Sequence, residues 1–154
     1  MPDQSKIAAA VVGVGYLGKF HAEKYTDSPK ATLVAVVDID KGRAESVADQ
    51  LGVAAFTDYR ELLGQVQCVS VAVPTRLHYE VASYFLERKV DVLVEKPIAT
   101  DIQQGRELVE LASAQGLILQ VGHLERFNPA IRRLENTIQE PRFVECHRLA
   151  PFVE

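Results

Sequence analysis

The sequence predicts an α/β protein with a doubly wound Rossmann fold, in which a six-stranded, mainly parallel sheet is covered by helices on both faces. Three observations predict this fold. Short runs rich in β-branched residues alternate with longer segments of helical period, the order expected of parallel strands joined by crossover helices. The run 68–73 is apolar at odd-numbered and even-numbered positions alike, as in a strand whose two faces are both buried. A glycine-rich turn also follows the first run directly.

The expected elements alternate along the chain. Strands are expected at 7–12, 32–37, 53–56, 68–73, 90–94 and 117–121. Helices are expected at 16–26 and 42–51, briefly after Asp58, along the stripe Leu77, Val81, Tyr84 and Phe85, and between Thr100 and Gly116. Thr100 and Gln103 have the spacing of a capping box, and Gly116 is placed to close that helix.

The segment after the sixth strand differs in character. We expect a helix to about Gln139, and the alternation in 142–149 predicts a further strand that has no visible partner in this sequence. The expected division is a dinucleotide-binding Rossmann domain at 1–122, a crossover segment and helix at 123–140, and the start of a truncated substrate domain at 141–154. On this interpretation the chain is a fragment or a natural truncation whose substrate domain is missing, and the unpaired strand offers an edge for a homodimer.

The composition of the chain limits the kinds of partner and binding site that can be expected. The 154 residues are 47% apolar and 25% charged, the profile of an ordinary globular domain. A formal net charge of −4 gives no basic excess, so neither nucleic acid nor a membrane surface is an expected partner. The two cysteines, Cys68 and Cys146, and the histidines lack the spacing of a disulfide framework or a metal site. With no leader pattern and no apolar segment near the ~20 residues of a membrane span, a cytoplasmic location is expected.

The first chemical motif is the G-x-G-x-x-G of Gly13, Gly15 and Gly18, placed after a strand and opening a helix. Gly13 permits the tight turn, Gly15 lets a pyrophosphate approach the backbone, and Gly18 lets helix and strand pack closely. Tyr16 and Leu17, between these glycines, are expected to contact the cofactor as well. Unpaired N–H groups at the helix start then face the phosphates.

Asp38 lies at the end of the second expected strand, 20 residues beyond Gly18. A carboxylate there accepts hydrogen bonds from both hydroxyls of the adenosine ribose and repels a 2′-phosphate, so the sequence favours NAD over NADP as cofactor. The alternative is that the glycines are only turn residues and Asp38 only a strand-end cap.

With these motifs the chain resembles the family of glucose–fructose oxidoreductase, inositol dehydrogenase and MocA (Gfo/Idh/MocA), over essentially its whole length. The resemblance depends on the glycine motif, on Val71-Ala72-Val73-Pro74-Thr75-Arg76-Leu77-His78, and on Val94-Glu95-Lys96-Pro97. It implies that Lys96 is the catalytic residue beside nicotinamide and substrate, where it orients the reacting alcohol or assists its proton transfer. General chemistry agrees, because a cation near the alcohol favours the developing alkoxide. The alternative is a solvated surface lysine.

The same resemblance implies further cofactor contacts. Pro74, Thr75 and His78 would line the cofactor groove, although His78 has the equal alternative of capping or solvating the helix that it opens. Glu95 would contact the nicotinamide-side ribose. Arg126, in the stretch Gly122 to Pro129, would pair with a carboxylate or phosphate of substrate or cofactor, or else form a structural salt bridge. A cis peptide bond before Pro97 is also expected.

Three functions follow from these features. The first is a dehydrogenase that transfers a hydride between nicotinamide and a sugar or sugar-nucleotide alcohol. The sequence of residues 122–129 resembles that of family members of the UDP-N-acetylglucosamine 3-dehydrogenase type. Alternatives are an NAD-binding regulatory or sensor module, and a structural unit that has lost its ligand. A P-loop phosphotransferase is disfavoured, because no Gly-Lys-Ser or Gly-Lys-Thr follows the glycines. The resemblance places the remaining catalytic residues in the missing domain, so the chain alone is expected to bind NAD with little or no turnover.

Overall fold

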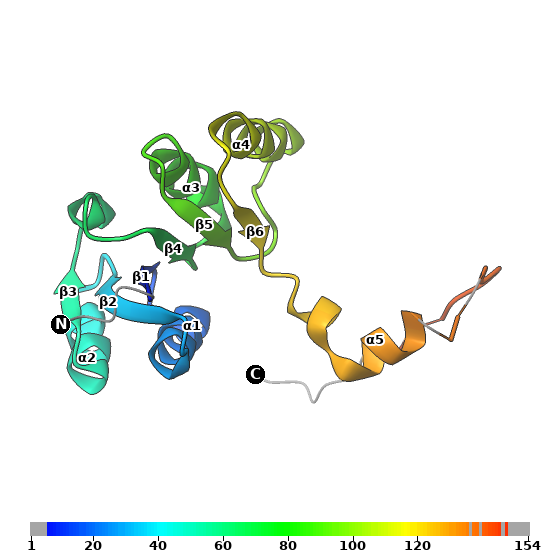
Figure 1. The fold of residues 1–154 in the computed structure, drawn as a ribbon, viewed down its shortest axis with the longest axis horizontal. Coiled ribbons are helices and arrows are strands. Elements are labelled where there is room, and N and C mark those ends of the chain that lie inside the picture. The colour runs from blue at the N-terminus through cyan, green and yellow to red at the C-terminus, as the bar shows by residue number, and fades with distance from the viewer. Residues whose placement is uncertain (1–5, 136, 139, 146, 148–154) are drawn as a thin grey trace. The chain divides into compact units, whose positions relative to one another are not determined.

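The computed structural model describes residues 6–135, 137, 138, 140–145 and 147. The chain forms two compact units, Met1–Gly122 and His123–Glu154. The first unit contains the strands β1 (Ile7–Val12), β2 (Ala31–Val37), β3 (Ala54–Phe56), β4 (Cys68–Val71), β5 (Asp91–Val94) and β6 (Leu119–Val121). They form one sheet in the order β3-β2-β1-β4-β5-β6, and every neighbouring pair is parallel (Figure 1). The predicted six-stranded Rossmann sheet is confirmed, and it is parallel throughout.

Helices cover both faces of this sheet. They are α1 (Tyr16–Asp27), α2 (Lys41–Leu51), α3 (His78–Leu86) and α4 (Ile102–Gln115), with short 3-10 helices η1 (Tyr59–Leu62) and η2 (Thr75–Leu77). Figure 1 shows α1 and α2 on one face and α3 and α4 on the other. Val11 packs in a cluster with Ala22 of α1, whereas its neighbour Val12 packs in a second cluster with Phe85 of α3 and Leu108 of α4. This alternation is the period of two that gives a strand two buried faces.

The strands end in register, which determines where the loops emerge. Val12 lies opposite both Val37 and Val71. Val71 lies opposite Val94, which lies opposite Val121. The residues that follow these valines therefore leave the sheet along one edge, its carboxyl edge.

Several boundaries in the first unit differ from the prediction by one or two residues, among them the end of β4 and the start of α4. Strand β4 ends at Val71 rather than at residue 73, because its neighbours β1 and β5 turn away after Val12 and Val94 and leave the next residues no parallel partner. Helix α4 starts from Asp101, whose carboxylate accepts from the N–H groups of Gln103 and Gln104 at 2.7 and 3.3 Å. The capping box at Thr100 was therefore wrong by one residue, since a carboxylate is a better acceptor for the first N–H groups than a hydroxyl. Gly116, at φ 67°, closes the helix as predicted.

The described part of the second unit contains two short helical segments. It contains the 3-10 helix η3 (Leu124–Phe127) and α5 (Pro129–Glu135), which is shorter than the predicted helix to Gln139, itself outside the described residues. In the predicted strand 142–149, the described residues 142–145 and 147 are not in a strand, and the others lie outside the description. Alternation alone does not make a strand when no neighbour supplies its backbone hydrogen bonds. No helix in the described residues is long and apolar enough to cross a membrane.

Candidate cofactor site

The glycine turn joins β1 to α1 at the centre of the sheet, where the strand order reverses between β1 and β4. Gly13 has φ +87°, and its N–H donates to the Val37 carbonyl at 2.8 Å. A Cβ on Gly13 would lie 2.8 Å from the backbone of Ala72, and one on Gly18 would lie 1.7 Å from the Gly13 oxygen. The fold itself therefore requires glycine at both positions, for the tight turn and the close helix packing that the motif predicts.

Gly15 differs from these two glycines. It precedes α1 with φ −67°, and a Cβ there would meet nothing within 4 Å. It has no side chain to occupy the first N–H groups of α1, and the first turn of that helix contains no acidic residue. Tyr16 is 82% exposed and Leu17 44%. The start of α1 is thus open and electropositive; contacts of Gly15, Tyr16 and Leu17 with a cofactor stay predictions.

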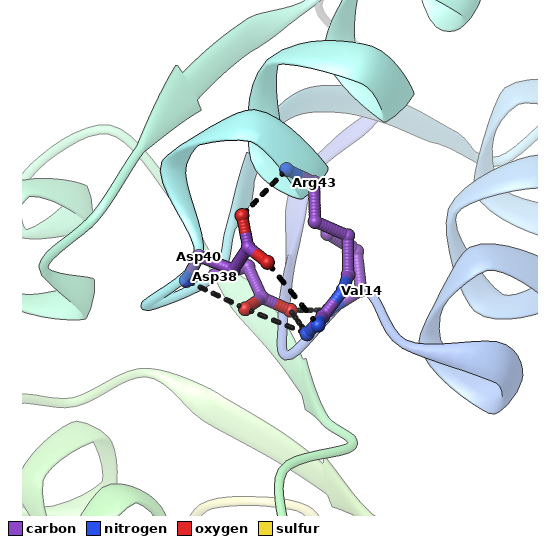
Figure 2. A network of polar contacts seen from close by, with 4 residues as sticks. All are labelled: Val14, Asp38, Asp40 and Arg43. Carbon is purple, nitrogen blue, oxygen red and sulfur yellow. Dashed lines mark hydrogen bonds and ion pairs between the residues drawn. The ribbon is translucent and has the colours of Figure 1, made fainter.

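Asp38 follows β2 and is 6% exposed. Its Oδ2 accepts from the Val14 N–H and its Oδ1 from the Asp40 N–H, both at 3.0 Å (Figure 2). One guanidinium nitrogen of Arg43, Nη1, donates to Oδ1 at 3.0 Å and to Oδ2 at 3.1 Å. Asp38 thus ties the glycine turn to the start of α2, and each of its oxygens already has two donors.

Arg43 belongs to the first turn of α2, and the sequence reasoning overlooked it. The Asp40 carboxylate caps the helix by accepting from the Arg43 N–H at 3.0 Å, and it also lies 3.4 Å from Nη2 of the guanidinium. A cation at a helix N-terminus opposes the helix dipole and therefore needs nearby acids. The sequence signal for this ion pair is the arginine that stands five residues after the acid at the strand end.

The loop after β4 contains the next predicted contacts. Pro74 is exposed and Thr75 half-buried, at the start of η2. His78 begins α3 and is 1% exposed, and its ring nitrogens Nδ1 and Nε2 lie 2.8 Å from the carbonyl oxygens of Pro97 and Val73. This corrects the expectation for His78. Its side chain is buried and neither solvated nor open to a groove, because both ring nitrogens lie against carbonyl oxygens and connect the β4 loop to the β5 loop.

Glu95 and Lys96 follow β5. Glu95 is 5% exposed; its Oε1 lies 2.9 Å from His21 Nε2, and its Oε2 accepts from the Lys96 N–H at 3.2 Å. A Cβ on Gly122 would lie 3.0 Å from Oε1, so the carboxylate is closely packed against the end of β6. Lys96 itself is exposed, and the Lys96–Pro97 peptide is cis, as predicted.

His21 is the second residue that the sequence reasoning missed. Gly18 and Ala22 are buried on α1, and His21 and Tyr25 are partly buried beside them. These positions form one helical stripe, so a histidine on it was the signal of a buried polar contact. Arg126 belongs to η3 of the second unit and is exposed, and its role stays a prediction. Within the described residues, no group of three His, Cys, Asp or Glu side chains is arranged to hold a metal ion.

Comparison with known proteins places this geometry in context. The family model described as oxidoreductase family, NAD-binding Rossmann fold (Gfo/Idh/MocA), matches residues 7–123. UDP-N-acetylglucosamine 3-dehydrogenase of Acidithiobacillus ferrooxidans is 39% identical over 143 residues, which is 92% of this chain and 45% of that protein. The scyllo-inositol 2-dehydrogenase (NAD(+)) of Bacillus subtilis is 35% identical over 131 residues, 82% of this chain and 38% of that protein.

Solved structures agree. UDP-N-acetylglucosamine 3-dehydrogenase GnnA from Acidithiobacillus ferrooxidans superposes with a TM-score of 0.81 at 36% identity, over 86% of this chain and 43% of that one. GenD2 from gentamicin A biosynthesis, in complex with NAD, superposes with a TM-score of 0.84 at 31% identity, over 86% and 39%. The chain thus spans less than half the length of these relatives.

Proposed function

Because the chain belongs to the oxidoreductase family with an NAD-binding Rossmann fold, we propose that it binds NAD along the carboxyl edge of its sheet. In the whole protein this domain serves a dehydrogenase that transfers a hydride between nicotinamide and a secondary alcohol of a sugar or sugar nucleotide. The observation that carries the proposal is the register of the strand ends. It brings the glycine turn, Asp38, the β4 loop and Lys96 to one edge, where open α/β sheets bind their ligands.

The proposed roles follow the order of the strands. The pyrophosphate lies on Gly15 and the open start of α1. The adenosine ribose lies at Asp38, and the nicotinamide end lies beyond β4, beside Pro74 and Thr75. Asp38 favours NAD over NADP, since a buried carboxylate repels a 2′-phosphate.

Lys96 is proposed as the catalytic residue. It is exposed directly after β5, and its own N–H is held by the buried Glu95 carboxylate, so the start of its side chain is fixed. An ammonium group beside the reacting hydroxyl stabilises the alkoxide that forms as hydride leaves. Glu95 is the last proposed cofactor contact of the first unit, and Arg126, in the second unit, keeps its predicted pairing with a carboxylate or phosphate of substrate or cofactor.

A sugar or sugar nucleotide is the proposed substrate class. This proposal is supported by the similarity to UDP-N-acetylglucosamine 3-dehydrogenase and to inositol dehydrogenases, which by their names dehydrogenate a sugar nucleotide or an inositol. In the proposed division, 1–122 binds the cofactor, 123–140 crosses over and 141–154 begins the substrate domain. This chain by itself then binds NAD without turnover, and the whole protein is cytoplasmic.

The test is calorimetric titration of this chain with NAD and NADP. NAD is expected to bind more tightly, and Gly15→Ala to weaken NAD at least about tenfold by crowding the pyrophosphate. The thermal stability of that variant should be unchanged, because the added methyl meets no protein atom. Unchanged NAD affinity in Gly15→Ala would contradict the placement of the pyrophosphate.

The NAD preference is tested by Asp38→Asn, which is expected to reduce it. Asp58→Asn is the matched control, since Asp58 also accepts a backbone N–H and pairs with an arginine, Arg60, but follows β3 rather than a strand of the proposed site. Loss of the preference in both variants would show that the effect is a general one of charge.

A further inference from the structure

We propose, on the basis of the proposed function, that His21 and His78 are positioning residues for Lys96. They hold the chain on either side of this lysine, from opposite faces of the sheet. His21 acts through the side chain of the preceding residue, Glu95. His78 acts through the carbonyl group of the following residue, Pro97.

Lys96 depends on its backbone for its position. It is exposed, and within the described residues its ammonium group has no hydrogen bond or ion pair. A lysine side chain is a flexible four-carbon stem, so its reach is set by the backbone from which it starts. A contact that fixes the chain next to Lys96 therefore also limits where the ammonium group can lie.

The first contact is made by His21, on the face of the sheet that α1 covers. Its Nε2 lies 2.9 Å from Oε1 of Glu95, and the other carboxylate oxygen accepts the Lys96 N–H at 3.2 Å. The side chains of His21 and Glu95 are 11% and 6% exposed, so little water competes for either partner. Without His21 the carboxylate would be free to rotate, and the Lys96 N–H would lose a fixed acceptor.

The second contact is made by His78, at the start of α3, which covers the other face of the sheet (Figure 1). Its ring nitrogens lie 2.8 Å from the carbonyl oxygens of Pro97 and Val73, and the residue is 1% exposed. Val73 belongs to the loop after β4, so one buried ring connects the loop that contains Lys96 to its neighbour. The chain is therefore held after Lys96 as well as before it.

These contacts begin where the backbone pairing of the sheet stops. The Glu95 N–H donates to the Val71 carbonyl at 3.0 Å, as it would within a ladder. Strand β5 ends at Val94, however, and the Lys96 N–H has a side chain as its acceptor. Pro97 has no N–H to donate. The two histidines thus supply the restraint that the sheet no longer gives, at a residue whose proposed role in proton transfer requires accurate placement.

Amide hydrogen exchange, followed by NMR on a chain with ¹⁵N-labelled lysine, tests these contacts directly. The Lys96 amide reports the proposed site. Two other lysine amides serve as internal controls: Lys19 lies in the first turn of α1, and the Lys89 N–H donates to the last residue of α3. Both controls lie near helix ends, where exchange follows local opening, so they report disturbance of the helices that contain the two histidines.

His21→Phe is expected to speed exchange at Lys96 about tenfold or more, and at Lys19 less than about threefold. His78→Phe keeps an aromatic ring and should act in the same way on Lys96 while sparing Lys89. His21→Gln provides an amide donor near the position of Nε2 and should restore slow exchange. Equal acceleration at all three amides would mean that the variants loosen the whole domain, and would overturn the proposal.

Ligand binding connects these contacts to the proposed function. Calorimetry uses NAD, ADP-ribose and ADP, of which only the first two contain the ribose proposed to lie at Glu95. His21→Phe and His78→Phe are each expected to weaken NAD and ADP-ribose about tenfold, and ADP less than about twofold. A disturbance of α1 itself would weaken ADP as well, because the proposed pyrophosphate site lies at the start of that helix.

Tyr25→Phe is the matched control for lost stability. Tyr25 lies on the same stripe of α1 as His21, but its hydroxyl contacts Ser70 of β4 at 2.9 Å rather than the loop after β5. This variant should leave exchange at Lys96 and the ratio of ADP-ribose to ADP affinity within about threefold of the parent chain. The same loss in Tyr25→Phe as in His21→Phe would reduce the effect to general destabilisation and overturn the proposal.

The remaining outcomes separate the inference from the proposed function. If NAD binds and both histidine variants keep the parent ratio of ADP-ribose to ADP affinity, this inference alone is overturned. If the parent chain binds neither NAD nor ADP-ribose, the proposed function fails and this inference fails with it.

Discussion

Two buried carboxylates, Asp38 after β2 and Glu95 after β5, look alike in sequence but differ in structure. They are 6% and 5% exposed, and each follows a strand at the carboxyl edge. Asp38 accepts from two backbone N–H groups and Glu95 from one, and each carboxylate also contacts a side-chain nitrogen. Their side-chain partners differ, since Arg43 is 48% exposed and His21 only 11%. The partner of Asp38 can therefore leave it at little cost, whereas the partner of Glu95 is held in place by burial.

The difference follows from where each partner is anchored. Arg43 approaches Asp38 from the first turn of α2, at the rim of the sheet. His21 approaches Glu95 from the buried stripe of α1, so it cannot leave without exposing apolar surface or burying an unpaired polar group. Burial of a pair makes each partner costly to remove, while an exposed partner contributes little.

The largest expected effect is that of Glu95→Ala. It leaves His21 and the Lys96 N–H without their acceptor and opens a void beside Gly122. We expect the free energy of unfolding to fall by roughly 2–4 kcal/mol, measured by denaturant titration. The exposed Glu110 of α4 provides a control, because its change to alanine should stay within about 0.5 kcal/mol. Equal effects of the two variants would remove the distinction drawn for Glu95.

A smaller effect separates the two partners directly. His21→Phe keeps an aromatic ring on α1 but leaves Glu95 Oε1 unpaired, so it should cost about 1–3 kcal/mol of unfolding free energy. Arg43→Gln breaks an ion pair whose basic member is half exposed, and should cost less than about 1 kcal/mol. If Arg43→Gln proves the more destabilising, Asp38 is the structural carboxylate and the comparison is reversed.

The sheet could be predicted because each strand and turn is determined by residues close together in the sequence. The glycine motif specifies its own turn, and the runs ending at Val12 and Val94 can be recognised from their own mainly apolar residues. The two carboxylates could also be located, as acids directly after strands. The pairing of His21 with Glu95 could not, because it joins positions 74 residues apart and depends on which helix packs behind which strand.

The failures have the same origin. The alternation in 142–149 is as regular as that of a true strand, but a strand also needs a neighbour that sequence pattern does not supply. For His78, sequence showed a polar side chain opening a helix after β4. It did not show that the Pro97 carbonyl, from the loop after β5, lies 2.8 Å from its ring and takes up one of its nitrogens.

The last prediction tests whether the Glu95 pair alone anchors α1. Tyr25 lies on the same helical stripe as His21, and its hydroxyl is 2.9 Å from Oγ of the fully buried Ser70. Tyr25→Phe removes this hydrogen bond and should lower the free energy of unfolding by about 1 kcal/mol at neutral pH, less than His21→Phe.

The pH dependence of that variant gives an independent check on the burial of α1. Burial raises the pKa of Tyr25 from 10.0 to about 12. As the pH rises through 10.0 the unfolded chain ionises this phenol while the folded chain keeps it neutral, so the parent chain loses stability up to a pH of about 12. Phenylalanine has no such ionisation, and the advantage of tyrosine seen at neutral pH should shrink across this interval in denaturant titrations. A constant difference would mean that the phenol is solvated in the folded chain, and that His21 and Glu95 alone provide the buried polar anchor of α1.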